Sequence, residues 1–425
     1  MLDIKLFRDT PDLVRRDLQK RGRDVGVVDD IARLDREWRD AEDEIKRLRT
    51  RRNTASVEIG KKKGTPEAVA IQAEMKTIGG RIGELEKNVE ALKTERDAKL
   101  RRMPNLMHES VPIGADDSGN VTVRTWGEAK PHAFEAKSHV DLLTSLDVGD
   151  IERAARASGA RFYYLKNELV LLDQALIKFA LDRLWKKGYS PILPPYMMRR
   201  EAVEGAVDLA DFQDVIYKIE GEDLYLLATS EHAIAAMHMG EILEEKQLPL
   251  RYAGVSPCFR KEAGSHGKDT KGIFRVHQFH KVEQFIFSTP EQSWPLHEEL
   301  IANAEAMYKE LGIPHRVVNI CTGDLGTVAA KKYDIEAWMP VQGAFREVVS
   351  GSNCTDYQAR RYNARCWKAP GEPTRFMHTL NATAMATQRT LVAILENFQD
   401  AAGVVHVPTA LRPYAGVDEI RPRRS

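Results

Sequence analysis

The sequence predicts an α+β fold in two parts, a long antiparallel helical hairpin followed by a larger body. Two observations predict it. Residues 28–102 carry apolar side chains at alternating steps of three and four, which is the seam of a coiled coil. From about residue 166 onward, helix and strand patterns alternate irregularly without a repeated βαβ unit, which favours a mixed, mainly antiparallel sheet flanked by helices. We expect the arm to span residues 1–105 and the body residues 106–425.

The hairpin rests on two apolar seams separated by a break. The first seam has Arg52 in one position and otherwise contains Ile31, Leu34, Trp38, Ala41, Ile45, Leu48, Ala55 and Ile59. The second contains Ile71, Met75, Ile78, Ile82, Leu85, Val89 and Leu92. Residues 60–67, GKKKGTPE, hold two glycines, a proline and no apolar residue, so they should reverse the chain. Thirty helical residues span about 45 Å, and such an arm should protrude.

A basic cluster lies toward the far end of this hairpin. Residues 46–63 contain one acid, Glu58, and eight basic residues: Lys46, Arg47, Arg49, Arg51, Arg52, Lys61, Lys62 and Lys63. A charge run is usually a solvated helix face, but a mixed-charge face should continue along the hairpin, and here the acids nearly vanish. Contact with the phosphate backbone of a structured RNA therefore stands beside the solvated face as an explanation.

Composition excludes several classes of protein. The 425 residues include 63 Lys+Arg and 63 Asp+Glu, so net charge carries no information about nucleic acid. The four cysteines form no CxxC pair, so we expect neither a disulfide scaffold nor a zinc site. The chain has no signal-peptide core and no run of eighteen apolar residues. We therefore expect a cytoplasmic protein that does not enter a membrane.

The most informative stretch is residues 253–287, which should form a strand, a polar loop and a second strand. Arg260 and Glu262 share one face of the first strand. One face of the second strand carries Arg275, His277, Phe279, Lys281 and Glu283. The other face carries Val276, Gln278, His280, Val282 and Gln284. A solvated face with charges paired across strands is the ordinary explanation, but neither face is plainly apolar, so we favour a sheet that covers a site.

The residue types on that sheet suit ATP and an amino acid. Arginines bind phosphates bidentately, an aromatic ring can stack on adenine, and a carboxylate can bind an ammonium group. The chain contains no GxxxxGKS or GxxxxGKT loop and no GxGxxG turn, so nucleotide would have to be bound in another way.

Residues 258–283, CFRKEAGSHGKDTKGIFRVHQFHKVE, resemble motif 2 of the class II aminoacyl-tRNA synthetases, most closely the version in the seryl-tRNA synthetase family. GYSPILPPYMM (188–198) resembles motif 1, with Pro195 at its characteristic proline, and LLATSEHA (226–233) resembles the serine-binding element. REVVSGSNCTDYQARR (346–361), HTLNATAMATQRTLVAILENFQ (378–399) and VPTALRPYAG (407–416) resemble the stretch before motif 3, motif 3 and the C-terminal end. An N-terminal coiled coil is that family's tRNA-binding arm.

The resemblance implies a serine–tRNA ligase with a class II catalytic domain. Such an enzyme uses ATP and Mg²⁺ to convert L-serine to seryl-adenylate and then transfers serine to the 3′ end of tRNA(Ser). The sequence leaves open whether tRNA(Sec) is a second acceptor. The helix before motif 1 would contribute to a homodimer interface.

The resemblance also implies roles for individual residues. ATP would be bound by Arg260, Glu262, Arg275, Val276, Phe279, Glu347, Val348, Val349, Ser350 and Arg389. Arg260, Arg275 and Arg389 would be catalytic, while Glu347 and Ser350 would hold the metal. Serine would be bound by Thr229, Ser230, Glu231, Glu283 and Thr383. The tRNA would be bound by Arg47, Arg49, Arg51, Arg52, Lys61, Lys62 and Lys63.

Several of these residues have simpler explanations from their positions alone. Thr229 and Thr383 could be ordinary strand or cap residues, Arg389 a surface arginine, and Asn381 the turn into the last long helix. The run ATAMATQR lacks the glycines common in motif 3, and LADF (209–212) replaces an LPKF-like segment of many members. Thr383 stands where many members have serine, and its extra methyl group should tighten the pocket against threonine.

Three other functions stand against this one. A synthetase-like relative could activate an amino acid for a carrier protein or small molecule, although the basic arm argues against that acceptor. A non-catalytic RNA-binding scaffold would not need the full set of charged residues. A purely structural coiled-coil protein would leave the body of the chain unexplained.

Overall fold

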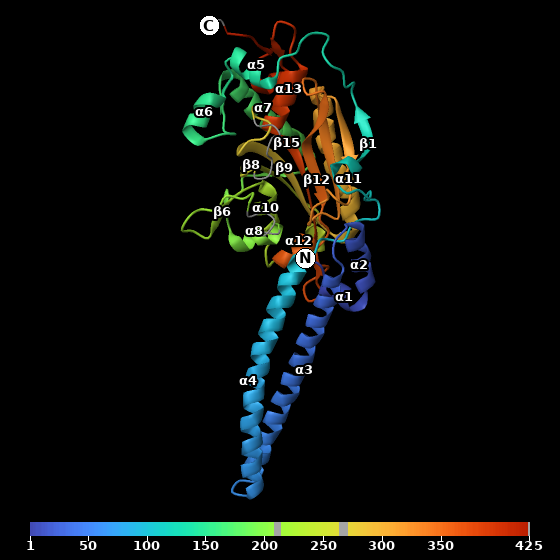
Figure 1. Cartoon of the computed structure of the whole chain (residues 1–425), viewed down its shortest axis with the longest axis vertical. Coiled ribbons are helices and arrows are strands. Elements are labelled where there is room, and N and C mark those ends of the chain that lie inside the picture. Colours follow the sequence, from blue (N-terminus) through green and yellow to red (C-terminus); the bar gives the residue numbers. More distant parts are fainter. Residues whose placement is uncertain (208–213, 263–270, 424–425) are drawn as a thin grey trace. The chain divides into compact units, whose positions relative to one another are not determined.

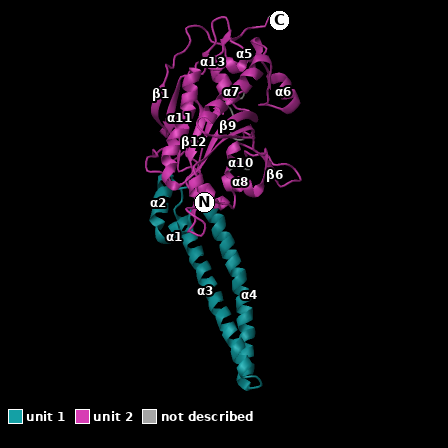
Figure 2. Cartoon of the chain, turned by 180° about the vertical axis from the view of Figure 1, so that it is seen from behind, with its two compact units in different colours: residues 1–106 teal, residues 107–425 magenta. Residues whose placement is uncertain are grey.

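The computed structural model describes residues 1–207, 214–262 and 271–423. The chain divides into two compact units, Met1–Leu106 and Met107–Ser425 (Figure 2). Two segments named above, LADF and most of the polar loop after Glu262, lie outside the described residues. Among the residues that are described, no helix is both long and apolar enough to cross a membrane.

Unit 1 consists of helices. They are α1 (Ile4–Asp9), α2 (Pro11–Lys20), α3 (Gly26–Lys61) and α4 (Pro66–Arg101). Helices α3 and α4 pack along their length as an antiparallel hairpin (Figure 1), which confirms the predicted one. Each has 36 residues and is therefore about 54 Å long. The Thr65 hydroxyl accepts a hydrogen bond from Ala68 N, and Pro66 opens α4, so ordinary capping chemistry restarts the helix after the break.

The hairpin is held by the predicted seam over most of its length. The buried apolar side chains include Ile31, Leu34, Ala41, Ile45, Ala55, Ile78, Ile82, Leu85 and Val89. Arg52, which the heptad pattern assigned to the seam, is exposed. Its neighbour Arg51 instead bridges the two helices with an ion pair to Glu74 at 2.7 Å, so a polar contact joins the helices at this level, while Ala55 and Ala68 nearer the tip are buried.

A buried carboxylate joins three segments of unit 1. Asp35 in α3 is fully buried and lies 2.6 Å from Arg8 in α1, 3.1 Å from Arg39 and 3.1 Å from Arg96 in α4. Burial alone would raise the pKa of Asp35, but the hydrogen bond and charge of Arg8, with the other two arginines, hold it below its usual value. These contacts fasten the base of the hairpin.

Unit 2 is built on an eight-stranded sheet in the order β1-β10-β11-β12-β15-β9-β8-β4. In that order, the strands are Val121–Trp126, His315–Asn319, Lys331–Met339, Ala344–Asn353, His378–Ala386, Gln278–Ser288, Leu250–Phe259 and Ser190–Ile192. Among the described strands of this sheet, only β4 and β8 pair in parallel, which confirms the mixed, mainly antiparallel sheet. The edge strand β1 falls in a region where the sequence pattern was too weak to predict an element.

Helices and short strands surround this sheet. The helices are α5 (His139–Ser145), α6 (Ile151–Ser158), α7 (Asn167–Lys186), α8 (Arg200–Ala206), α10 (Ser230–Ala235), α11 (Ser293–Leu311), α12 (Tyr357–Tyr362), α13 (Thr387–Asn397) and α14 (Arg412–Ala415). The short strands are β2 (Gly149–Asp150), β3 (Tyr164–Leu165), β5 (Met197–Arg199), β6 (Leu224–Leu226), β7 (Ile242–Glu244), β13 (Arg365–Trp367), β14 (Arg375–Phe376), β16 (Val405–His406) and β17 (Glu419–Ile420).

The two faces of the sheet are covered differently. Helices α7, α11 and α13 pack on one face over the larger core, while α8, α10 and α12 pack over a second core on the other. Strand alternation divides β9 between them, because Val282 and Ile286 enter the first core and Phe285 and Phe287 the second. Polar residues on the first face also find partners, since Gln284 Nε2 donates to Leu300 O on α11.

Candidate active site

A cavity of about 420 Å³ lies in unit 2 on the face of the sheet opposite α11. Its walls come from β9, β11, β12 and β15, the chain after β8, and the first turns of α10 and α13. The following residues predicted to bind ATP or serine line it: Thr229, Glu231, Arg260, Glu262, Arg275, Val276, Phe279, Glu283, Glu347, Val348, Ser350, Thr383 and Arg389. The fold therefore gathers segments spread over 160 residues of sequence into one site.

The side chains of two other predicted residues point elsewhere. Val349 is buried in the core on the helix side, because its neighbour Ser350 on β12 faces the cavity and successive strand residues alternate. Ser230 is also buried, and its hydroxyl donates to Gly254 O at 3.4 Å. Any contact of these two residues with a ligand would have to come from the backbone.

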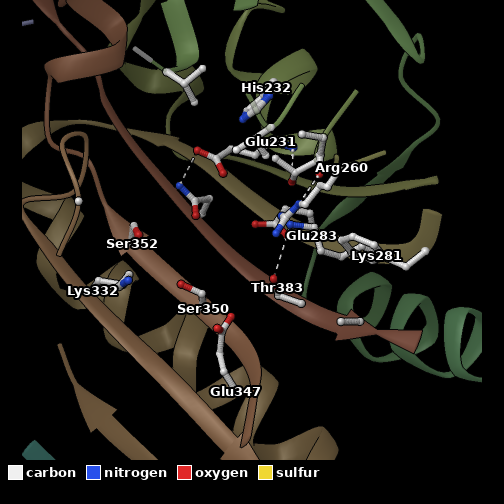
Figure 3. Close-up of a pocket in the computed structure, with 18 of the residues that line it drawn as sticks. Glu231, His232, Arg260, Lys281, Glu283, Lys332, Glu347, Ser350, Ser352 and Thr383 are labelled. Carbon is white, nitrogen blue, oxygen red and sulfur yellow. Dashed lines mark hydrogen bonds and ion pairs between the residues drawn. The ribbon is translucent and has the colours of Figure 1, made fainter. Parts of the chain in front are cut away.

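One end of the cavity, here called the carboxylate end, is formed by Glu231, Lys281, Glu283, Asn381 and Thr383. Glu283 Oε2 lies 2.6 Å from Lys281 Nζ and accepts a hydrogen bond from Thr383 Oγ1 at 3.2 Å (Figure 3). The last contact follows from strand register, since Thr383 on β15 stands directly opposite Glu283 on β9. Burial raises the pKa of Glu283, while the positive charge of Lys281 acts against that rise.

Glu231 is the second acid of the carboxylate end. Its Oε1 accepts hydrogen bonds from Gln358 Nε2 at 3.0 Å and Asn381 Nδ2 at 3.1 Å. Burial, together with the nearby charge of Glu283, raises the pKa of Glu231 to about 7. Asn381 lies in the middle of β15, so its explanation as the turn into α13 is wrong. The neighbouring His232 has its pKa lowered to about 3 by burial and by Lys281 and Arg260, so it is neutral near pH 7.

The other end, here called the arginine end, is formed by Arg260, Phe274, Arg275, Glu347 and Arg389. The first motif 2 strand ends at Phe259, so Arg260 is placed by the chain after the strand, where its backbone N–H donates to His277 O at 2.9 Å. Its guanidinium lies 5.2 Å from the centroid of the Phe279 ring. Arg275 Nη1 lies 3.7 Å from Glu262 Oε2. Both arginines border the cavity, and the charge of Arg260 also acts on Glu231 and Glu283 at the carboxylate end.

Arg389 is held in place from two sides. Its Nη1 donates to Glu347 O at 2.9 Å and lies 3.3 Å from Glu347 Oε1. Its guanidinium also lies 5.1 Å from the centroid of the Phe274 ring. The guanidinium of Arg346 lies 4.5 Å from the same centroid. These contacts in the first turn of α13 place Arg389 in the cavity wall, so it is more than an unconstrained surface residue.

Glu347 and Ser350 fit the requirements of a magnesium ion bound with a nucleotide. Both offer oxygen ligands to the cavity, and Mg²⁺ is usually held by one or two carboxylates together with substrate phosphates. Partial desolvation in the cavity wall would raise the pKa of Glu347, whose side chain is 47% exposed, but the charges of Arg389 and Lys332 hold that pKa below its usual value, so the carboxylate is ionised. In the described part of the chain, no three His, Cys, Asp or Glu residues are grouped as a metal site, so phosphate oxygens would have to complete the coordination.

Several cavity residues were not among the predicted ligands. Lys281 and Ser352 could have been found by strand alternation, since each lies two residues from a predicted ligand on the same strand. Lys332 and Phe274 carried no comparable signal. Gln358, which lies behind the cavity, was the hardest to find, because it is on α12 and does not itself line the cavity.

The predicted basic residues of the hairpin fall into two groups. Arg49 pairs with Glu86 at 2.8 Å, and Arg51 pairs with Glu74. The others are exposed and form no ion pair with any described residue: Arg47, Arg52, Lys61, Lys62 and Lys63. A polyanion could therefore meet five unpaired cations near the tip of the hairpin.

Comparison with known proteins identifies relatives over the whole chain. A family model described as the tRNA synthetase class II core domain (G, H, P, S and T) matches residues 215–398, and one described as the seryl-tRNA synthetase N-terminal domain matches residues 1–107. A serine–tRNA ligase of Pyrococcus horikoshii is 57% identical over 445 aligned positions, which cover 99% of this chain and 98% of that protein.

Solved structures give the same result. The crystal structure of seryl-tRNA synthetase from Pyrococcus horikoshii complexed with ATP matches with a TM-score of 0.96 at 56% identity and covers 100% of both chains. The cytoplasmic serine–tRNA ligase of Naegleria fowleri in complex with AMP matches with a TM-score of 0.90 at 37% identity, covering 100% of this chain and 99% of that one.

Proposed function

The chain belongs to the seryl-tRNA synthetase family, and from that premise we propose that it activates L-serine with ATP and esterifies the seryl group to the 3′ end of tRNA(Ser) and of tRNA(Sec). The observation that carries this proposal is the division of one cavity into two ends. Arg260, Arg275 and Arg389 offer positive charge at one end, and Glu231 and the buried Glu283 offer carboxylates at the other. An amino acid bound by its ammonium group would therefore direct its carboxylate toward a nucleotide.

In the first proposed step, the serine carboxylate attacks the α-phosphorus of ATP, the bond to the β-phosphate oxygen breaks, and pyrophosphate leaves. No side chain has to remove a proton, because the attacking carboxylate is already ionised. Arg260 and Arg275 neutralise charge on the phosphate oxygens, and Phe279 stacks on the adenine. Glu347 and Ser350 would hold Mg²⁺, which supplies further neutralisation of the phosphates when bound.

In the second proposed step, the 3′-hydroxyl of the terminal adenosine of tRNA attacks the carbonyl carbon of seryl-adenylate and AMP leaves. The chain contributes mainly by holding the adenylate in one orientation, since positioning of two reactants removes much of the barrier. Glu231, Glu283 and Thr383 would hold the seryl group throughout, with Thr229 at the start of α10 beside them.

We assign tRNA binding to residues 1–105 and the chemistry to residues 106–425, with the reaction in the cytoplasm. The five unpaired cations of the hairpin support the first assignment, because exposed Lys and Arg exchange their counterions for phosphates. We also propose a homodimer formed through the motif 1 segment. Large apolar side chains of this segment and of the preceding helix α7 are exposed in the single chain, with Leu193 73%, Met197 50% and, on α7, Trp185 66% accessible, which is typical of a surface covered by a second copy.

Charging of total tRNA by the purified protein, with labelled serine, alanine and threonine in parallel, tests the proposal. ATP-dependent charging with serine alone is the expected result, and separate tRNA(Ser) and tRNA(Sec) transcripts test the two acceptors. If no amino acid is charged, serine-dependent pyrophosphate exchange separates the alternatives. Exchange without charging would indicate a different acceptor, and absence of both would favour a non-catalytic RNA-binding protein.

A further inference from the structure

Gln358 lies behind the carboxylate end of the cavity and does not line it. Its side chain is fully buried. The amide Nε2 donates to Glu231 Oε1 at 3.0 Å and to Ala206 O at 3.3 Å, and the amide Oε1 accepts a hydrogen bond from Thr379 Oγ1 at 2.7 Å. A carboxylate and a carbonyl can only accept, so these partners fix which end of the amide faces Glu231.

The two oxygens of Glu231 are used unequally. Oε1 accepts from Gln358 and also from Asn381 Nδ2 at 3.1 Å. Among the described residues, no hydrogen bond reaches Oε2, and Glu231 borders the cavity. The carboxyl group is therefore anchored by one oxygen from behind, which leaves its other oxygen for a donor that enters the cavity. Figure 3 shows Glu231 on the cavity wall beside Arg260 and Glu283.

Without its hydrogen bonds to Gln358 and Asn381, the Glu231 side chain could adopt other orientations. The charges that act on it are Glu283, which repels it, and Lys281 and Arg260, which attract it. Without the two amide donors, the carboxylate could turn toward these cations and be withdrawn from the ligand. Asn381 is itself a cavity residue, whereas Gln358 does not line the cavity and reaches the carboxylate end through its hydrogen bond to Glu231.

We propose that Gln358, fixed by Thr379, is a positioning residue that holds Glu231 with Oε2 directed at the ammonium group of the bound amino acid. This inference rests on the proposed function and adds a residue for amino-acid recognition that does not touch the substrate. The energy of a hydrogen bond to a charged group corresponds to about a tenfold change in affinity or more. Its loss should appear in the binding of serine and not in the binding of ATP.

The test is serine-dependent pyrophosphate exchange by the full-length Gln358→Met variant, which keeps the side-chain length and removes the amide Oε1 and Nε2. The serine KM should rise about tenfold while the ATP KM stays within about twofold. Gln399→Met is the matched control, because Gln399 is another buried glutamine whose amide bonds, to Lys137 and Glu396, lie outside the cavity. It should leave the serine KM unchanged. An unchanged serine KM in Gln358→Met, or equal rises for serine and ATP, overturns the inference.

A pH profile separates positioning from a general structural role. Glu231 must be ionised to bind an ammonium group, so kcat/KM for serine should rise with pH through the Glu231 pKa of about 7. Removal of an N–H donor from a carboxylate raises its pKa, so the midpoint should move to higher pH in Gln358→Met. Glu283, Lys281 and Arg260, and the buried Cys354 and Tyr362 that also face Glu231, are the same in both proteins. A midpoint that does not move overturns the inference.

Thr379→Val provides a second variant if Gln358→Met does not fold. It removes the hydroxyl that fixes the amide while retaining Gln358, and the serine KM should rise about threefold in the folded protein. No change in that value overturns the inference. Absence of serine-dependent exchange in the unaltered protein would instead contradict the proposed function, so the two failures are distinguishable.

Discussion

The hairpin and the cavity use the same kinds of charged residue in opposite surroundings. In the hairpin, Arg81 pairs with Glu44 at 3.0 Å, and the two side chains are 49% and 37% exposed. In the cavity, Lys281 pairs with Glu283 at 2.6 Å, and the two are 7% and 1% exposed. Water and salt weaken the first pair, whereas loss of one partner from the second leaves a buried charge uncompensated. Surroundings, and not residue type, therefore decide what each charge can do.

The largest expected effect comes from removing the hairpin and keeping the cavity. Deletion of residues 40–90 should reduce tRNA charging at least 10³-fold, since the arm supplies the phosphate contacts. Serine-dependent pyrophosphate exchange should stay within about threefold, because every cavity residue remains. The deleted residues next to the two cuts, Ala41 and Ile45 on α3 and Leu85 and Val89 on α4, form one cluster across the hairpin. The ends that remain should therefore face each other, and a short Gly-Ser turn can join them. Equal loss of both activities would contradict the division of labour.

Glu283→Gln tests the buried pair directly. The change strands Lys281 without its anionic partner and removes a ligand for the ammonium group of serine, so kcat/KM for serine should fall roughly 10³-fold. Steady-state exchange kinetics measure this. The ATP KM should stay within about threefold, and circular dichroism should show a folded protein. A loss of less than tenfold in kcat/KM would mean that the buried pair behaves like an exposed one.

Phe279→Ala sharpens the comparison within the cavity by separating its two ends. The ring lies beside Arg260 at the arginine end, and stacking of a base on an aromatic ring contributes about 1–3 kcal/mol. The ATP KM should therefore rise about tenfold in pyrophosphate exchange, while the serine KM changes less than threefold. Equal increases in both constants would argue against adenine stacking.

Thr383→Ser tests a single methyl group at the carboxylate end. The Thr383 side chain is buried and its hydroxyl donates to Glu283, so serine at this position keeps the bond and enlarges the pocket. The ratio of serine to threonine activation should fall about tenfold, as measured by exchange with each amino acid. Thr390→Ser, at a buried threonine of α13 that does not line the cavity, is the matched control. An unchanged ratio in Thr383→Ser would refute the prediction.

Arg81→Ala removes the exposed ion pair with Glu44 and should have the smallest effect on stability. Solvent screens the contact with Glu44, so the melting temperature should stay within about 2 °C of the parent protein. Thermal denaturation followed by circular dichroism at low and high salt measures it. A large, salt-independent decrease would show that the hairpin pairs are more structural than their exposure indicates.

Sequence patterns predicted the architecture well where they are periodic. The heptads gave α3 and α4, and the GKKKGTPE break gave the turn between them. Strand β1, VTVRTW, was missed because its apolar–polar alternation lasts only four residues and because its place at the sheet edge depends on pairing with β10, a contact that is distant in the sequence. Arg52 was assigned to the seam because a heptad count cannot detect where two helices change from apolar to polar contact.

Strand alternation and resemblance to a family predicted the residues that line the site, but not the residues that support them from behind. Most predicted ligands line the cavity, and their individual roles stay predictions. Val349 was included because it neighbours Ser350 in a matched stretch, although alternation turns it to the opposite face. Asn381 was misread because its partner Glu231 is 150 residues away in the sequence. Gln358 has no local signal, because its place behind Glu231 depends on packing of α12 that no motif encodes.

The three arginines around Asp35 have a mechanical consequence for the hairpin. A rod fixed at one end converts a small tilt at its base into a large displacement at its tip. From Asp35 to the end of α3 at Lys61 the arm is about 39 Å long, so a tilt of 5° moves the tip by roughly 3 Å. Asp35 and its partners in α1, α3 and α4 therefore act as the clamp of a lever. Loss of an ion pair to Asp35 would therefore increase the range of motion of the five unpaired cations, although no residue near the tip is changed.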